Sequence, residues 1–261
     1  MNKTKIDWVD FSWNPVVGCR HGCEYCYARN IARRFASKNP GDDCTQPGSG
    51  LHEVRYKRNG SAYRYGFEPT LYSYRLGEPE RLQAIQKHKS SKIFVCSMAD
   101  LFGEWVPDEW IKQVFDACVR APKHTYFFLT KNPQRYIDLE NLPADARRWW
   151  WGHSTDGQSY NGATCFRTEN MGGSRQKRFV SVEPFIHGPL LWPFGSATFP
   201  DWVIVGAQTQ PLRLPKREWV LDIREKCKQY DIPLFEKSSL GALNLPGGLI
   251  RQWPDLSVRG V

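Results

Sequence analysis

Short apolar runs alternate with amphipathic helical segments along most of the chain. Strand-like runs cover residues 7–17, 92–98, 124–130, 149–154, 178–184, 202–206 and 232–235. Apolar residues at helical spacing predict helices over 28–39, 81–88, 107–120, 133–139 and 216–230. Strands that are joined through helices run parallel, so the alternation predicts an α/β fold built as a partial or complete parallel (β/α) barrel.

The length and the absence of an internal repeat favour one barrel domain over residues 1–261. No apolar run approaches the 18 residues of a membrane span, and residues 1–10 have no apolar signal-peptide core. We therefore expect a cytoplasmic, monomeric protein with no membrane partner. Eight cysteines in such a chain indicate metal ligation rather than disulfides.

Residues 40–80 interrupt the alternation. An Asn59-Gly60 pair between two strand-like runs predicts a β-hairpin inserted in the barrel domain. Basic and aromatic side chains interleave along this hairpin: Arg55, Tyr56, Lys57, Arg58, Tyr63 and Arg64. With a net charge of +9, the pattern predicts contacts to nucleic acid, because basic groups neutralise phosphates and rings stack on bases. The alternative is a solvated ribbon whose tyrosines pack on the domain.

Three cysteines converge in the segment 18–27. Cys19, Cys23 and Cys26 follow a C-x3-C-x2-C spacing, and Gly18 and Gly22 mark an open loop. Cysteine thiolates hold iron-sulfur clusters, and a 4Fe-4S cluster normally takes four of them. Three clustered cysteines therefore predict a 4Fe-4S cluster with one iron open to a ligand.

A structural zinc site is the competing interpretation of this loop. The same cysteines could bind Zn²⁺ with His21 or a remote cysteine as the fourth ligand. Structural zinc sites usually show a second pair of ligands, and no second C-x2-C or H-x3-H follows here.

Polar residues follow the predicted strands where each one ends. In barrels the working groups lie at the carboxyl ends of strands, so these residues form a candidate cofactor and substrate site. They are Ser97, Asp100, Thr130, Lys131, Ser154, Glu183, Gln208 and Lys237.

The chain resembles the radical S-adenosylmethionine superfamily, and within it a family carried by phages and bacteria. The resemblance rests on the cysteine spacing with Tyr25 before the last cysteine, and on motifs across most of the chain outside 40–80. These motifs are Trp13-Asn14-Pro15, the segment 97–102, Leu129-Thr130-Lys131, the segment 181–184 and the segment 202–206.

The resemblance implies a barrel of the radical S-adenosylmethionine type with the 4Fe-4S cluster on Cys19, Cys23 and Cys26. It also implies that S-adenosylmethionine binds the open iron and is cleaved to a 5'-deoxyadenosyl radical. Tyr25 would lie beside the adenine, and Ser97, Asp100, Lys131, Ser154 and Glu183 would bind the cofactor. Such enzymes need a low-potential electron donor such as flavodoxin or ferredoxin.

The family also resembles enzymes of phage pathways that hypermodify thymidine, which implies a DNA or modified-nucleotide substrate in the cytoplasm of a host cell. The most specific expectation is an isomerase that moves an amino-acid substituent on a thymine-type base from nitrogen to carbon attachment. Asp10, Asn14, Gln208 and Lys237 are the candidates for substrate contacts, with Asp10, Gln208 and Lys237 as catalytic residues. Where the family reads Gly-Glu-Ser-Gly, this chain has Ala207-Gln208-Thr209-Gln210, and its Lys-Gln-Trp segment is reduced to Lys237.

Two other functions stay open. One is repair of a thymine photoproduct by a related lyase. The other is a zinc-binding or cluster-binding protein that binds nucleic acid without catalysis.

Overall fold

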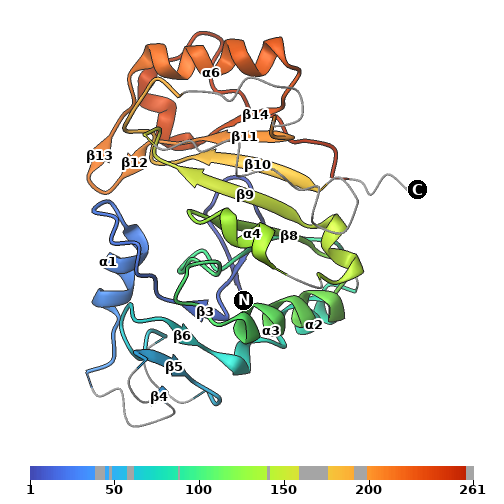
Figure 1. The fold of residues 1–261 in the computed structure, drawn as a ribbon. Coiled ribbons are helices and arrows are strands. Elements are labelled where there is room, and N and C mark those ends of the chain that lie inside the picture. Colours follow the sequence, from blue (N-terminus) through green and yellow to red (C-terminus); the bar gives the residue numbers. More distant parts are fainter. Residues whose placement is uncertain are drawn as a thin grey trace. The chain divides into compact units, whose positions relative to one another are not determined.

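The structure, a computed structural model, describes residues 1–38, 45–46, 49–57, 62–87, 89–139, 142–158, 176–190 and 199–256. The chain divides into two compact units, residues 1–132 and 133–261. Both units combine helices with a mostly parallel sheet, as the alternation of strands and helices predicts (Figure 1). Over these residues no helix has the length and apolar character needed to cross a membrane.

The main sheet of the first unit has the strand order β1-β2-β7-β8. These strands are β1 (Asn2–Lys3), β2 (Phe11–Trp13), β7 (Lys92–Val95) and β8 (Thr125–Thr130). β1 runs antiparallel to β2, whereas β2, β7 and β8 run parallel. The carboxyl ends of these parallel strands therefore meet at one edge of the sheet, next to the segment that carries the cysteines.

Helices α2 (Glu78–Ile85) and α3 (Asp108–Arg120) contact each other in the first unit, where Arg120 of α3 donates to the Glu80 carboxylate of α2 at 2.9 Å. α3 buries an apolar stripe that includes Val114 and Phe115. The ring of Phe115 packs edge to face on Phe128 of β8, with 5.5 Å between centroids. The helical spacing of apolar residues that predicts this helix is therefore the face that covers the sheet.

A smaller sheet in the first unit has the order β3-β6-β5-β4. It consists of β3 (Val16–Val17), β6 (Thr70–Leu71), β5 (Leu51–Glu53) and β4 (Thr45–Gln46), and the 3-10 helix Ser73–Arg75 follows it. The predicted single strand over 7–17 is thus two strands in two sheets, because the chain turns at Pro15, whose carbonyl accepts the Tyr72 N–H at 2.7 Å.

The hairpin that the Asn59-Gly60 pair predicts, with strand-like runs over residues 52–65, has a different pairing in its described part. β5 pairs antiparallel with β4 and parallel with β6, and Tyr63 forms an isolated bridge with Ala36. The His52 and Val54 N–H groups donate to residues 69 and 71 across the β5–β6 pair. These longer-range hydrogen bonds take the donors that a local hairpin would use. The Asn59-Gly60 turn and Arg58 lie outside the described residues.

Helix α1 (Tyr27–Arg34) begins directly after the cysteines, with Cys26 at its N-cap. It buries Ala28 and Ala32, and Ala28 packs in an apolar cluster with Val54, Tyr72 and Met98. The helix ends at Arg34, five residues before the predicted end, and the Phe35 N–H closes its last turn on the Ile31 carbonyl at 3.1 Å.

The sheet of the second unit is parallel throughout, in the order β9-β10-β11-β14. Its strands are β9 (Trp150–Thr155), β10 (Lys177–Val182), β11 (Trp202–Val205) and β14 (Leu234–Glu236). A small hairpin of β12 (Gln208–Thr209) and β13 (Leu212–Arg213) follows β11. The unit also contains α4 (Gln134–Asp138) and the 3-10 helices Ala144–Arg148 and Ser238–Leu243.

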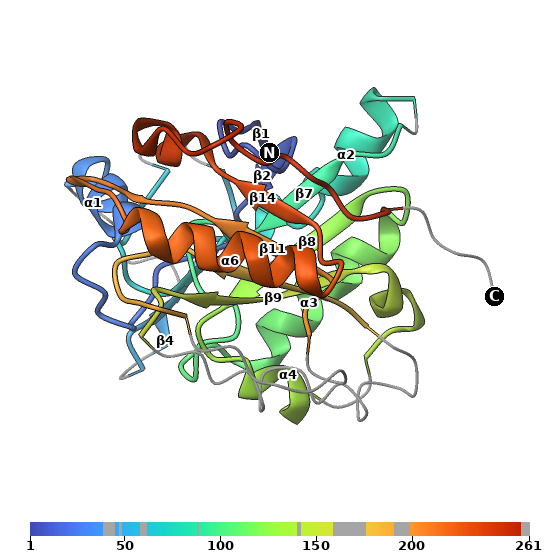
Figure 2. The ribbon, with the colours of Figure 1, turned by 90° about the horizontal axis from the view of Figure 1, so that it is seen from above.

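Helix α6 (Arg217–Gln229) lies along one face of this second sheet, as Figure 2 shows from above. Its buried Val220, Ile223 and Cys227 share an apolar core with residues of β10, β11 and β14, including Val203 and Leu234. On the same helix, Arg224 donates two hydrogen bonds to the fully buried Glu236 carboxylate at 2.7 and 2.8 Å.

The outer edge of β14 is covered by the chain that follows. Gln252 donates its backbone N–H to the Leu234 carbonyl at 2.9 Å, and its side-chain oxygen accepts the Leu234 N–H at 3.0 Å. Its carbonyl also accepts the Trp202 indole N–H at 2.9 Å. Gln252 therefore satisfies backbone groups that an uncovered edge strand would present to solvent.

Candidate functional site

The cysteine loop enters through Gly18, where the chain makes a close approach that a side chain would block. Gly18 has φ +96°, and a Cβ there would lie 2.4 Å from the Glu68 carbonyl oxygen. The Gly18 N–H donates to the Met98 carbonyl at 3.0 Å, and the Cys19 N–H donates to the Phe67 carbonyl at 3.3 Å. These bonds fix the start of the loop beside the turn that follows β7.

The thiols of Cys19, Cys23 and Cys26 are free and half-buried on this loop. Cys26 is the N-cap of α1, and its sulfur accepts the Arg29 N–H at 3.4 Å. The pKa of the Cys19 thiol is raised to about 12, mainly by burial and also by the nearby Asp100, Cys23 and Cys26, while the His21 N–H opposes the shift. A bound cation would reverse this shift, because a metal-bound thiol is deprotonated.

The donor chemistry of the loop fits a thiolate-held metal group, but the loop is not a preformed metal site. Within the residues described above, no group of three or more His, Cys, Asp or Glu side chains converges in ligand geometry. Three accessible sulfurs on one loop beside a helix N-terminus are the donor set that iron-sulfur clusters and zinc use.

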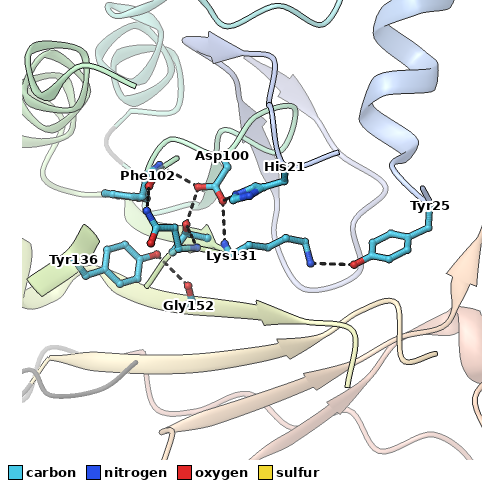
Figure 3. Close-up of polar contacts among 9 residues, drawn as sticks. His21, Tyr25, Asp100, Phe102, Lys131, Tyr136 and Gly152 are labelled. Atoms are coloured by element: carbon cyan, nitrogen blue, oxygen red, sulfur yellow. Dashed lines mark hydrogen bonds and ion pairs between the residues drawn. The ribbon is translucent and has the colours of Figure 1, made fainter. Parts of the chain in front are cut away.

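Asp100 is the centre of a hydrogen-bond network behind the loop (Figure 3). Its Oδ2 lies 2.7 Å from His21 Nε2 and accepts the Lys131 N–H at 2.9 Å. Its Oδ1 accepts the Thr130 hydroxyl at 2.7 Å and the Phe102 N–H at 3.0 Å. Because Asp100 is only 5% exposed, these donors replace the water that a carboxylate requires. The carboxylate joins the cysteine loop to the end of β8.

Lys131 and Tyr25 form a second link between the same two segments. The Lys131 ammonium donates to the Tyr25 hydroxyl at 3.1 Å and lies 5.4 Å from the centre of the Tyr25 ring. Figure 3 shows the lysine side chain extending from the end of β8 toward the start of α1. The structure thus brings together two residues for which the family resemblance implies cofactor binding.

Ser97 also lies at this edge. Its hydroxyl donates to the Asn14 side-chain oxygen at 3.2 Å, and the same oxygen accepts the Met98 N–H at 2.9 Å. The Ser97 carbonyl accepts the Tyr27 hydroxyl at 2.7 Å. Asn14 and Ser97 therefore tie the end of β2 to the turn after β7, which is consistent with a shared site at the carboxyl edge of the first unit.

Asp10 is at the opposite edge of the first unit's sheet, so it does not join this group. It precedes β2, and its carboxylate accepts the Lys92 N–H at the start of β7 at 2.8 Å. In a parallel pair the amino ends lie at the edge away from the carboxyl ends. Asp10 aligns two strands, and we remove it from the candidate catalytic residues.

In the second unit, Glu183 and Lys237 form an ion pair at the carboxyl edge of the sheet. The register pairs Val182 with Val205 and Val205 with Glu236, so the residues one step beyond are Glu183, Gly206 and Lys237. A Cβ on Gly206 would lie 3.0 Å from Glu183 Oε1 and 3.0 Å from Lys237 Cδ. The bare glycine between the two strands leaves the space that the ion pair occupies.

Ser154 and Gln208 are the other two predicted site residues of the second unit. Ser154 is half-buried near the end of β9, in register with Ser181. Gln208 begins the small hairpin, and its amide donates to the Pro211 carbonyl at 3.0 Å. That contact shapes the hairpin, and as an amide Gln208 cannot act as a base.

The predicted nucleic-acid residues of the 52–65 segment are only partly on the surface. Tyr63 is half-buried and packs against the cluster behind α1. Tyr56 is 74% exposed, Arg55 pairs with Glu53 at 3.3 Å, and Lys57 is exposed. The Arg64 N–H donates to the buried Tyr72 hydroxyl at 2.8 Å. The alternative in which tyrosines pack on the domain therefore holds for Tyr63 but not for Tyr56.

His21 is the residue whose position the sequence does not reveal. It lies in the middle of the cysteine spacing, where the sequence suggests only a possible zinc ligand. Its ring packs edge to face on the ring of Trp105, with 4.9 Å between the ring centroids. Its Nε2 also contacts the Asp100 carboxylate. Asp100 is 79 residues away in sequence, so only the fold brings the two together.

Comparison with known proteins gives one match. A model of the family DUF5131, described as a protein of unknown function, matches residues 3–243. No curated protein and no solved structure matches the chain.

Proposed function

We propose that this chain, which belongs to the DUF5131 family, is a radical S-adenosylmethionine enzyme that modifies a thymine-type base in DNA. The observation that carries the proposal is the loop with three half-buried thiols, Cys19, Cys23 and Cys26, at the carboxyl edge of parallel strands. In this proposal the three cysteines hold a 4Fe-4S cluster. The partial (β/α) barrel expected from the sequence belongs to the same proposal, and the parallel strands of both units support it.

When bound, the reduced cluster and S-adenosylmethionine would supply a radical that removes hydrogen from an unactivated C–H bond. In the first unit, the chain's own residues hold the loop that would carry the cluster. Asp100 fixes the cysteine loop through His21, and Lys131 fixes Tyr25. Glu183 and Lys237 offer a carboxylate and an ammonium side by side, which complement the amino and carboxylate groups of an amino acid.

The specific reaction that we propose is an isomerisation of an amino-acid substituent on thymidine. One C–N bond breaks, one C–C bond forms, and the hydrogen is returned to the product, so the mass is unchanged. A base inside duplex DNA would have to be flipped out to reach a site at a strand edge. The net charge of +9 supports a polyanionic substrate.

Anaerobic reconstitution tests the proposal. The protein is loaded with iron and sulfide, reduced, and incubated with S-adenosylmethionine and with DNA that carries an amino-acid-modified thymine. We expect a brown protein that cleaves S-adenosylmethionine to 5'-deoxyadenosine when no DNA is present. With the modified DNA we expect a nucleoside of unchanged mass but altered retention time. The triple variant C19A/C23A/C26A is the control and should retain no iron. Wild-type protein that takes up no iron would overturn the proposal.

A structural zinc site is the second candidate, and the His21–Asp100 contact favours it. Histidines that bind metals usually donate their other ring N–H to a carboxylate, and Asp100 lies 2.7 Å from His21 Nε2. In this case Cys19, Cys23, Cys26 and His21 would bind Zn²⁺ in a protein without catalysis. Colourless protein with one equivalent of zinc, lost in an H21A variant, would establish this candidate instead.

A further inference from the structure

We propose that the exposed face of helix α1, formed by Tyr27, Asn30, Arg33 and Arg34 with the adjoining Phe35, binds a DNA strand. The inference extends the proposed function by naming the surface that presents the substrate strand to the cysteine loop. The predicted nucleic-acid residues lie elsewhere, in segment 55–64.

The geometry of α1 gathers these side chains on one side of the helix. With 3.6 residues per turn, Tyr27, Asn30 and Arg34 share one face, and Arg33 borders it. Ala28 and Ala32 occupy the opposite face and are buried. Tyr27 and Phe35 are 42% and 54% exposed. The helix therefore packs through small residues and turns its basic and aromatic residues to solvent.

The exposed face of α1 is positively charged. α1 contains no acidic residue, and Arg33 and Arg34 both lie in its last turn. Neither arginine forms an ion pair with any residue in the part of the chain that the structure describes. These cations complement the dipole at the end of the helix, but an eight-residue helix does not require two exposed arginines for that. Their positive field is available to phosphates.

The aromatic residues supply the second component of a single-strand site. The Arg34 guanidinium lies 5.4 Å from the centre of the Phe35 ring, so cation and ring form one surface. Tyr27 is held by its hydroxyl, which donates to the Ser97 carbonyl at 2.7 Å. A ring that is anchored in this way is a rigid platform on which an unpaired base can stack.

Tyr27 and Arg34 lie at opposite ends of α1, with Tyr27 at the end next to the cysteine loop. Tyr27 is the residue after Cys26 and touches Ser97, so it adjoins the cysteine loop. Arg34 is seven residues further on, about 10 Å along the helix at 1.5 Å per residue. In a stacked strand, which rises about 3.4 Å per nucleotide, that distance spans about three nucleotides. A strand whose phosphates contact Arg33 and Arg34 would thus bring a base to Tyr27.

DNA binding by the metal-free protein tests the inference directly. The probe is a fluorescently labelled oligothymidylate, and fluorescence anisotropy gives Kd over a range of salt concentrations. For R33A/R34A we expect binding at least tenfold weaker and a salt slope smaller by about 1.4, the value for two phosphates on a single strand. For F35A we expect about five- to hundredfold weaker binding, because base stacking contributes that much per base.

Two further variants make the result specific. K89A/K112A removes the same charge from exposed positions outside α1 and should change Kd less than twofold. R33K/R34K keeps the charge and should keep the salt slope. If R33A/R34A binds the oligonucleotide as tightly as the wild type, or K89A/K112A weakens binding equally, the inference is wrong.

The DNA-binding test and the test of the proposed function can fail independently of each other. Protein that takes up no iron but binds DNA through Arg33 and Arg34 overturns the proposed function and supports this surface. Protein that cleaves S-adenosylmethionine but binds no oligonucleotide overturns the surface alone.

Discussion

His21 Nε2 lies 2.7 Å from Asp100 Oδ2, and this contact joins the middle of the cysteine loop to the carboxyl edge of the first unit's sheet. Asp100 accepts three further hydrogen bonds, from Thr130, Phe102 and Lys131. The loop is therefore held by a carboxylate that the strands position, and its conformation depends on the sheet rather than on the cysteines alone.

Replacing Asp100 by Asn tests this dependence. The amide puts a donor group where the carboxylate accepts donors, so at least one buried donor loses its partner at a cost of about 1–3 kcal/mol. We expect D100N to unfold at lower urea and to expose the cysteine loop, with faster labelling of Cys19 and Cys23 by a thiol reagent. The matched control is D116N on the exposed face of α3, which should behave as the wild type. Equal urea midpoints for D100N and D116N would contradict the role of Asp100.

Gly206 provides a steric test of the Glu183–Lys237 pair. An alanine Cβ would lie 3.0 Å from both partners, tighter than ordinary contact, so the pair must shift. We expect G206A to lose about 1–3 kcal/mol of unfolding free energy, as other overpacked sites do. Under the proposed function, we also expect it to bind S-adenosylmethionine more weakly. G241A is the control, since a Cβ at Gly241 meets no atom within 4 Å. Calorimetric titration and urea unfolding give both quantities, and a G206A protein that matches G241A in both would argue against the pair.

The buried pair of Arg224 and Glu236 predicts a large stability effect from removing one partner. Glu236 is fully buried, and Arg224 also donates to the carbonyls of Pro246 and Gly248 at 2.7 and 2.6 Å. Leaving the carboxylate without its cation should cost about 3–5 kcal/mol. We expect R224M to show that loss in urea unfolding, and the double variant R224M/E236Q to recover part of it. If the double variant is no more stable than R224M, the loss of stability comes from the hydrogen bonds of Arg224 to the Pro246 and Gly248 carbonyls.

His124 predicts a pH dependence of stability. Burial lowers the pKa of its imidazole below the ordinary value of 6.5, while the Pro79 carbonyl at 3.3 Å partly opposes the shift. A folded-state pKa below the unfolded one means that the unfolded chain binds the proton more tightly. Protonation of His124 therefore does not affect the free energy of unfolding above pH 6.5. It lowers that free energy as the pH falls from 6.5 toward the folded-state pKa. The stability of wild type relative to H124Q should fall between pH 7.5 and pH 5.5 in urea unfolding, and a constant difference would refute the assignment.

The remaining cysteines differ from the loop cysteines in reactivity. Cys96, Cys118 and Cys227 are buried, and burial raises the pKa of each thiol, to about 12 for Cys96 and Cys227. A buried thiol with a raised pKa is a poor nucleophile. In a C44S/C165S background without metal, we expect Cys23 and Cys26 to react with a thiol reagent in the native state. Cys19 should react more slowly, because burial also raises its pKa to about 12, and Cys96, Cys118 and Cys227 should react only after denaturation. Mass spectrometry of labelled peptides identifies the sites, and fast native labelling of Cys118 or Cys227 would contradict the burial.

The sequence locates the cysteine loop and the strand ends because both depend on local patterns. A glycine before closely spaced cysteines marks an open turn, and Gly18 indeed has a positive φ. The end of a parallel strand is readable from where its apolar run stops, which is why Ser97, Asp100, Lys131, Glu183 and Lys237 lie at carboxyl edges.

Pairing between distant segments is what the sequence does not reveal. Asp10 reads as a polar residue beside the cysteine loop, but its role follows from the Lys92 N–H across the sheet. The sequence leaves open whether Tyr56 and Tyr63 contact nucleic acid or pack on the domain, and the structure separates them, because Tyr63 packs against the cluster behind α1. Each depends on a contact with a residue far away in sequence, and no local propensity encodes it.

The position of Gln252 means that residues 250–252, well beyond the end of β14, belong to the folded second unit. They seal the free side of β14 and hold the Trp202 indole through its N–H. Without them, a hydrogen-bonding edge beside a large aromatic side chain would be open to another molecule, which is the usual starting point for strand-to-strand association. Residues 250–252 thus occupy hydrogen-bonding groups that this edge would otherwise present to a neighbouring molecule.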